Sequence, residues 1–224
     1  MNTIWIILCT LAIDSKYGLP GVLCVYFCNN LAFARHELLH ILCARFTNLH
    51  IDSIWTNIKN VYGSTENSSL STIKTILNIG LGRLQSCPTY LLPMDYERNI
   101  RTWGKFAFLK LVPPTVDLTC FLLGFWSINN ASTIHSILLE FTGITLDRNT
   151  IIFCGGLIFV SSARLLPNWL PFPGLDGHIL CSGIKKVIWG EQVTLSGGQA
   201  NIFALTYLIL YTLSITHWLN ALAL

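Results

Sequence analysis

Long apolar segments separated by short polar ones dominate the pattern of this chain. Lys105 to Trp126, Thr150 to Leu166 and Ala200 to Leu222 are predicted to be membrane-spanning helices, because each approaches the length of about 20 mostly apolar residues that a bilayer requires. Between them, the pattern predicts a short helix over Ile134 to Phe141 and a proline-containing loop over Pro167 to Gly177. The chain therefore reads as mainly helical.

The N-terminal part has two apolar segments with a break between them. Thr3 to Ile13 is too short to cross a bilayer alone, so it is either a tilted span extended toward Lys16 or an interfacial helix. Gly18 to Pro20 interrupts the pattern. Gly21 to Phe46 is again long and mostly apolar, and we expect a further helix there.

Residues 47 to 104 form a more polar or interfacial subregion. Thr47 to Gly63 mixes β-branched and polar residues and predicts short strands, while Ser71 to Leu92 predicts an interfacial helix. The expected fold is an all-α polytopic membrane protein. It is a bundle of about four to six transmembrane helices with a small β element after the helix over Gly21 to Phe46.

Composition supports a membrane protein. The 224 residues are 52% hydrophobic and only 11% charged, with a mean hydropathy of +0.56. Soluble domains carry about 25% charged residues, so a compact soluble enzyme is disfavoured. The net charge of +3 is too small to indicate nucleic-acid binding. We expect residues 1–224 to form a single membrane-embedded domain, with 47–104 lying between spans.

Basic residues give the expected orientation through the positive-inside rule. If the helix over Gly21 to Phe46 runs from outside to inside, only Lys16 and Arg148 lie outside, and Arg35 and Lys110 lie within spans. The reverse orientation would place the basic excess outside. The residues then facing the cytosol are Arg45, Lys59, Lys74, Arg83, Arg98, Arg101, Lys105, Arg164, Lys185 and Lys186.

An HExxH motif, His36-Glu37-Leu38-Leu39-His40, lies in the apolar segment over Gly21 to Phe46. Residues four apart share one face of a helix, so both imidazoles can reach one ion, and Glu37 lies close enough to act on a water beside it. The alternative is a pair of surface histidines. Apolar flanks disfavour it, because burying two histidines and a glutamate without partners costs several kcal/mol.

Catalytic zinc usually has three protein ligands, and two histidines supply only two. Asp117 and Asp176 are acidic candidates in apolar surroundings, and His178 is a further option. Asp176 belongs to the stretch NWLPFPGLDG, which begins at Asn168.

HExxH in one membrane helix followed by N-x-x-P-x-P-x-L-D-G resembles the site-2 protease family of intramembrane zinc metalloproteases, in the compact form without an inserted soluble domain. The resemblance covers about Gly21 to Ile184. It implies a short strand region, which Leu49 to Tyr62 fits. It also implies that His36, His40 and Asp176 bind Zn²⁺, that Glu37 is the catalytic base, and that Asn168 positions the substrate backbone or stabilises the oxyanion.

The chain departs from the family pattern at two places. His178 follows Gly177 where the family often has a second glycine. In the middle span, Pro113-Pro114-Thr115-Val116-Asp117 stands where the family has G-P-x-x-N, so Asp117 either replaces a substrate-facing Asn or pairs with Lys110. Asn29 and Asn30 either line the cavity or make polar packing contacts.

We therefore expect an intramembrane zinc endopeptidase, an integral multi-pass protein of the cell membrane, or of the inner membrane in a prokaryote, with its active site toward the cytosol. Its expected partners are a transmembrane protein substrate and the lipid bilayer, with no nucleic acid. A regulatory membrane partner and the oligomeric state stay open. The alternative is a catalytically silent family member that binds or escorts a membrane protein partner. A zinc transporter is disfavoured, because the polar residues cluster at one depth.

Overall fold

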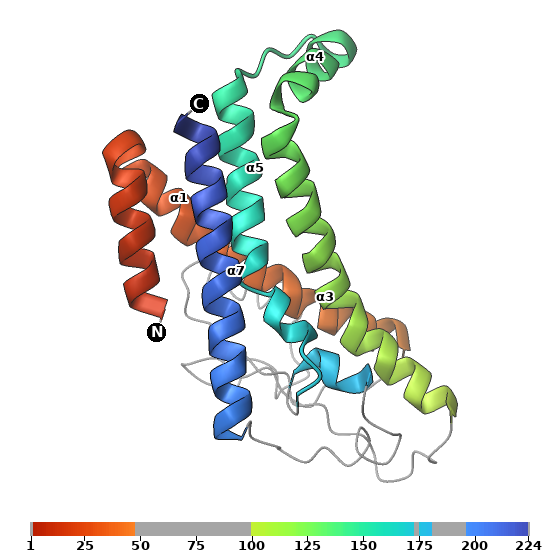
Figure 1. The fold of residues 1–224 in the computed structure, drawn as a ribbon. Coiled ribbons are helices and arrows are strands. Elements are labelled where there is room, and N and C mark those ends of the chain that lie inside the picture. The colour runs from red at the N-terminus through yellow and green to blue at the C-terminus, as the bar shows by residue number, and fades with distance from the viewer. Residues whose placement is uncertain (1, 48–99, 173–174, 181–195, 224) are drawn as a thin grey trace, which may run out of the picture. The chain divides into compact units, whose positions relative to one another are not determined.

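A computed structural model describes residues 2–47, 100–172, 175–180 and 196–223 of the chain, and within these ranges it is built from helices, with no strand. The elements are shown in Figure 1. In chain order they are α1 (Asn2–Thr47), α3 (Ile100–Asn129), α4 (Ala131–Thr142), α5 (Arg148–Ala163), the 3₁₀ helices η1 (Leu166–Trp169) and η2 (Asp176–Leu180), and α7 (Gly197–Ala223).

The predicted helices are confirmed in the described residues. Two of the segments predicted as spans lie in α3 and α7. The third, Thr150 to Leu166, covers most of α5 and ends at the first residue of η1, and the short helix predicted over Ile134 to Phe141 lies in α4. Within the part of the chain that the structure describes, three helical segments are long and apolar enough to cross a membrane: Ala107–Asn129, Arg148–Trp169 and Gly197–Ala223. The predicted β element after α1 and the predicted helix over 71–92 lie outside the described residues.

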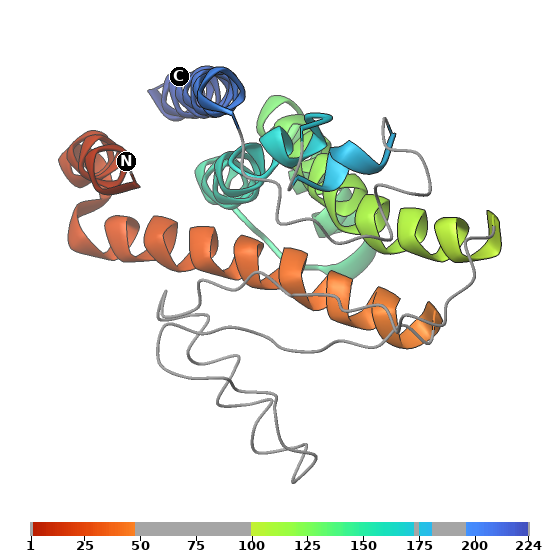
Figure 2. The same cartoon turned by 90° about the horizontal axis from the view of Figure 1, so that it is seen from below.

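The predicted break near Gly18 is a bend inside α1. Gly18 has φ 58° and ψ −161°, a left-handed backbone conformation that residues with a Cβ rarely adopt. Pro20 follows, and its missing N–H suits the first turn of the helical arm that begins there. Figure 2 shows the two arms of α1 running in different directions. The second arm carries the HExxH motif.

The chain divides into two compact units, which are described separately. The first unit comprises Met1–Ala32, Asp117–Leu166 and Leu205–Leu224, and the second comprises Phe33–Val116 and Pro167–Ala204. All three residues predicted as metal ligands belong to the second unit. The first unit is the helical scaffold considered next.

In the first unit, α5 packs closely against α3 and α7 (Figure 1). A Cβ added at Gly124 of α3 would meet the backbone nitrogen of Phe159 at 2.6 Å, so the two helices approach closely only because this residue is glycine. The indole of Trp218 covers Gly156, and its Nε1 donates a hydrogen bond to the Ile152 carbonyl at 3.1 Å. The buried core around these contacts consists of Val25, Ile128, Ala131, Ile151, Ile152, Phe159, Val160, Tyr211, Trp218 and Leu222.

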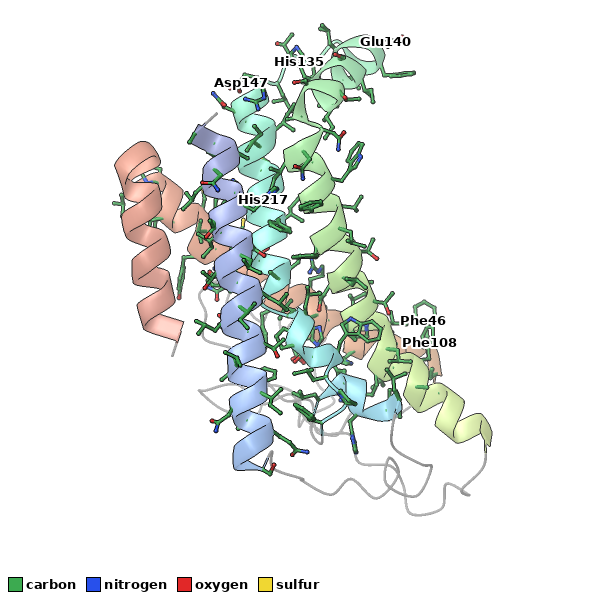
Figure 3. The ribbon with its side chains drawn as sticks, in the orientation of Figure 1. Phe46, Phe108, His135, Glu140, Asp147 and His217 are labelled. Atoms are coloured by element: carbon green, nitrogen blue, oxygen red, sulfur yellow. The ribbon has the colours of Figure 1, made fainter. Side chains whose placement is uncertain are left out.

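Two histidines of the first unit, His135 and His217, have packing or hydrogen-bond contacts that give them a structural role (Figure 3). His217 of α7 stacks on Phe125, with ring centroids 5.1 Å apart, and its Nε2 lies 3.3 Å from Nδ2 of Asn129. His135 of α4 donates through Nδ1 to the Leu146 carbonyl. Neither residue belongs to the candidate metal centre.

Candidate metal centre

His36 and His40 stand one turn apart on the second arm of α1, as the motif predicts. Both side chains are buried, their ring centroids are 4.8 Å apart, and their Nε2 atoms are 3.2 Å apart. The helix thus brings two imidazole nitrogens to one point inside the second unit.

Asp176 is distant from the two histidines in sequence but lies beside them in the structure. It is the first residue of η2 and is buried, and its Oδ2 lies 3.0 Å from His36 Nε2 and 3.3 Å from His40 Nε2. Of the three acidic or histidine candidates for a third ligand, Asp176 is the one in the cluster formed by the described residues. His178 instead directs Nδ1 toward the Pro171 carbonyl, 3.5 Å away.

Gly177 allows the loop to present Asp176 in this way. A Cβ at position 177 would lie 2.0 Å from the carbonyl oxygen of Trp169 and 2.8 Å from that of Leu170, distances at which backbone must move. The loop is also fixed to α3, because Trp169 Nε1 donates a hydrogen bond to the Pro114 carbonyl at 2.9 Å. The Asp-Gly pair therefore depends on close backbone packing inside the second unit.

The hydrogen bond at the far side of His40 determines which of its nitrogens faces the cluster. Nδ1 lies 2.9 Å from the carbonyl oxygen of Leu109, and a carbonyl can only accept, so Nδ1 carries the proton. In a neutral imidazole, Nε2 then presents a lone pair toward His36 and Asp176. This is the arrangement by which a metal-binding histidine is oriented by a backbone carbonyl.

Lys110 supports the third member of the cluster. Its Nζ lies 2.9 Å from Oδ1 of Asp176, so one carboxylate oxygen binds the ammonium and the other faces the imidazoles. Burial alone would raise the pKa of Asp176. The neighbouring Lys110 charge and the hydrogen bond from His36 outweigh burial and hold this pKa well below its ordinary value. Asp176 is therefore an anion at neutral pH.

The spacing of the three atoms fits a metal ion. Ligand atoms about 2.0 to 2.2 Å from a tetrahedral zinc ion lie about 3.3 to 3.6 Å from one another. The observed separations of 3.0, 3.2 and 3.3 Å among the two Nε2 atoms and Oδ2 are close to this. A cation at this point would also relieve the repulsion between the Nε2 lone pair of His40 and the carboxylate. Two imidazoles and one carboxylate are a donor set that suits zinc and leaves a fourth position for water.

Glu37 follows His36 directly and is half-buried on α1. It is not one of the three converging groups. A carboxylate next in sequence to a candidate ligand, but outside the cluster, is suited to hold or move a proton rather than to bind the ion.

The other predicted site residues lie outside the cluster. Asn168 is half-buried on η1, and its predicted contact with substrate stays a prediction. Asp117 is completely buried in α3 and belongs to the first unit. Asn29 also belongs to the first unit and donates through Nδ2 to the Tyr211 hydroxyl at 3.4 Å, which favours a packing role for it.

Sequence reasoning missed the part that α3 plays in the centre. Leu109 holds His40 through a backbone atom, which no side-chain pattern reveals. The sequence pattern offers Lys110 only as a partner for Asp117 and does not reveal its ion pair with Asp176. A lysine in an otherwise apolar span was the available signal, because such a charge needs a partner.

Comparisons with protein-family models, with curated proteins and with solved structures find no match to this chain.

Proposed function

We propose that this protein is an intramembrane zinc metalloprotease that hydrolyses peptide bonds of transmembrane substrates. One observation carries the proposal: the two histidines of an HExxH motif and a distant aspartate converge to within 3.3 Å in a buried cluster. Glu37 directly follows the first of these histidines in the sequence. The resemblance of the two motifs to the site-2 protease family points the same way.

His36, His40 and Asp176 would hold the zinc, each through one atom. The ion supplies Lewis-acid chemistry when bound, polarising a carbonyl and lowering the pKa of water. Lys110 keeps Oδ1 of Asp176 engaged, which favours binding through Oδ2 alone. Two of the three candidate ligands, His40 and Asp176, are thus held from outside by the Leu109 carbonyl and by Lys110.

Glu37 is the proton carrier of the proposed reaction. Its carboxylate takes a proton from the attacking water as the new C–O bond forms at the scissile carbonyl. It then passes that proton to the amine nitrogen as the C–N bond breaks, so the carboxylate ends as it began. Asn168 is assigned to the substrate, where its amide would hydrogen-bond the backbone or the oxyanion.

The membrane setting is part of the proposal. Three helices long and apolar enough to cross a bilayer support a multi-pass protein, with the helix over Gly21 to Phe46 as a further span and the active site toward the cytosol. A transmembrane substrate would unwind locally to reach the centre. The segment around Pro171, which its prolines are expected to hold extended, is where it would pair by strand addition.

A proteolysis assay with the full-length chain in proteoliposomes tests the proposal. The probe is a panel of single-span peptides carrying helix-destabilising Gly or Pro residues, and new N-termini are detected by mass spectrometry. We expect zinc-dependent cleavage that Glu37→Gln reduces by about 10²- to 10⁴-fold while zinc content is unchanged. The control is Glu140→Gln, at an exposed glutamate of α4 (Figure 3), which should cleave normally.

If the chain is instead a catalytically silent protein that binds a membrane partner, a different result is expected in the same assay. The peptides should then bind without being cleaved, and Glu37→Gln should not change their binding. Cleavage at the wild-type rate by the Glu37 variant would remove this residue from the mechanism. A wild-type chain that binds zinc but cuts no peptide of the panel would favour the silent alternative.

A further inference from the structure

Two adjacent prolines lie inside α3 beside the centre. Pro113 and Pro114 have no backbone N–H, so each deprives the carbonyl four residues earlier of its usual helical donor. The two carbonyls concerned belong to Leu109 and Lys110. Lys110 is also the residue whose side chain binds Asp176.

The Leu109 carbonyl nevertheless has a hydrogen-bond donor. Leu109 is completely buried, and a buried carbonyl without a donor is costly. The donor is Nδ1 of His40, at 2.9 Å. The side chain of a predicted metal ligand thus takes the place of the N–H that Pro113 lacks.

This hydrogen bond decides the tautomer of His40. With its proton on Nδ1, the neutral ring directs a bare Nε2 at His36 Nε2 and Asp176 Oδ2, which are 3.2 and 3.3 Å away. The opposite tautomer would place a proton between the ligands, where an ion should lie. In the Nδ1–H tautomer, His40 can therefore bind a metal ion through Nε2 directly. In the Nε2–H tautomer, the proton must first move from Nε2.

We propose that Pro113 is a positioning residue of the metal centre, acting by keeping the Leu109 carbonyl available to His40. The inference rests on the proposed function insofar as the cluster is a metal site. With an ordinary residue at position 113, a backbone N–H would point at the Leu109 carbonyl and close the helical bond. His40 would then have to share that oxygen or turn away from it. Pro113 stands where the resembling family has glycine, so this device belongs to the present chain.

The first test reads the tautomer in metal-free, full-length protein in detergent, with ¹⁵N-labelled histidine, at a pH above the titration of the ring. His40 is assigned by comparison with a His40→Gln sample. We expect Nδ1–H for the wild type and a mixture of tautomers for Pro113→Ala. Pro114→Ala is the matched control. This variant also restores one backbone N–H to the helix, but that N–H points at the carbonyl of Lys110 and not at that of Leu109. The backbone carbonyl at position 114, to which Trp169 donates, is unchanged.

A second variant separates the N–H from the ring of proline. In this variant, lactic acid replaces Pro113, and its hydroxyl oxygen forms an ester with the preceding residue in place of the amide. The variant therefore differs from Pro113→Ala only in having an oxygen where alanine has its backbone N–H. This variant should retain the wild-type tautomer. It also keeps the test informative if loss of the proline ring disturbs folding, because both variants lack that ring.

Zinc affinity, measured by competition with a chelator, provides the second readout. Pro113→Ala should bind zinc about 10- to 100-fold more weakly, as is typical when a group that orients a ligand is removed. The lactate and Pro114→Ala variants should match the wild type. The proposal is overturned if Pro113→Ala keeps the Nδ1–H tautomer and full affinity, which would mean that both donors share the carbonyl. It is also overturned if the lactate variant loses as much as the alanine variant.

These readouts separate this inference from the proposed function. The tautomer is measured without metal and without substrate, so it can support or overturn the role of Pro113 whether or not the chain cleaves peptides. A wild type that has the Nδ1–H tautomer and binds zinc but cleaves nothing would contradict the protease assignment alone.

Discussion

Lys110 and Asp176 form an ion pair across the second unit, with 2.9 Å between Nζ and Oδ1, while Oδ2 of the same carboxylate faces the two imidazoles. The two carboxylate oxygens therefore have different roles. One is held by a fixed cation from α3, and the other is directed at the candidate metal position. The pair determines both the orientation of Asp176 and its ionisation.

Replacing Lys110 with Met should raise the pKa of Asp176. In the folded chain this pKa is depressed, so the ionised carboxylate stabilises the fold at neutral pH. That contribution is lost as pH falls through the depressed folded value. Without the ammonium, protonation should occur at a higher pH, and the acid-induced loss of stability should begin earlier. The measurement is the infrared C=O stretch of the protonated carboxyl in metal-free protein, assigned by difference against Asp176→Asn.

Lys105→Met is the matched control, because it removes a lysine from the same helix without touching the Asp176 pair. It should leave the carboxyl band at the wild-type pH. Equal protonation behaviour in the Lys110 and Lys105 variants would contradict the assigned cause of the depressed pKa.

Asp176→Ala and His178→Ala should separate the two candidate ligands that lie two residues apart. Asp176 contributes Oδ2 to the cluster, whereas the ring of His178 is directed at the Pro171 carbonyl. We expect the Asp176 variant to lose zinc and the His178 variant to keep it, measured as metal content of the purified proteins. Zinc retained only by the Asp176 variant would reverse the ligand assignment.

Gly177→Ala should weaken zinc binding without removing any ligand. The added Cβ would meet the Trp169 carbonyl oxygen at 2.0 Å, so the loop that carries Asp176 must shift. Overpacking of this kind typically costs about 1 to 3 kcal/mol. Gly104→Ala is the control, since a Cβ there meets nothing within 4 Å. Equal zinc affinity in the two variants would show that the loop accommodates the methyl group.

Residues 47–104 should be cytosolic if the basic residues set the orientation. In a chain whose native cysteines have been replaced, a cysteine at Asn67 should escape a membrane-impermeant thiol reagent applied to intact cells. A cysteine at Thr145, in the exposed connection between α4 and α5, should react. The opposite labelling pattern would invert the topology while leaving the metal centre as described.

The helices and the two histidines of the cluster could be predicted because each leaves a local signature. Apolar length predicted α3, α5 and α7, the Gly18–Pro20 pair predicted the bend in α1, and the four-residue spacing placed His36 and His40 on one face. Asp176 could be singled out only through the resemblance, because spacing along the chain carries no information about a contact between residues 140 positions apart.

The supporting contacts could not be predicted for a different reason. The bond from His40 to Leu109 uses a carbonyl, which every residue has, and only the missing N–H of Pro113 marks it. The clash that makes Gly177 necessary involves the backbone of Trp169, whose position depends on folding of the whole loop. Such contacts depend on tertiary packing and have no pattern of residue types.

If the chain is the proposed protease, the hydrogen bond from Trp169 to the Pro114 carbonyl limits how a substrate could be admitted. Within six residues, α3 binds the imidazole of His40, the carboxylate of Asp176 and the indole of Trp169. A gate that opened by moving this part of α3 away from the motif helix or the loop would break these bonds and release two ligands from their supports. If the proposed enzyme keeps its metal between turnovers, it must therefore open along another side, with the segment from Leu109 to Pro114 as a wall that stays in place.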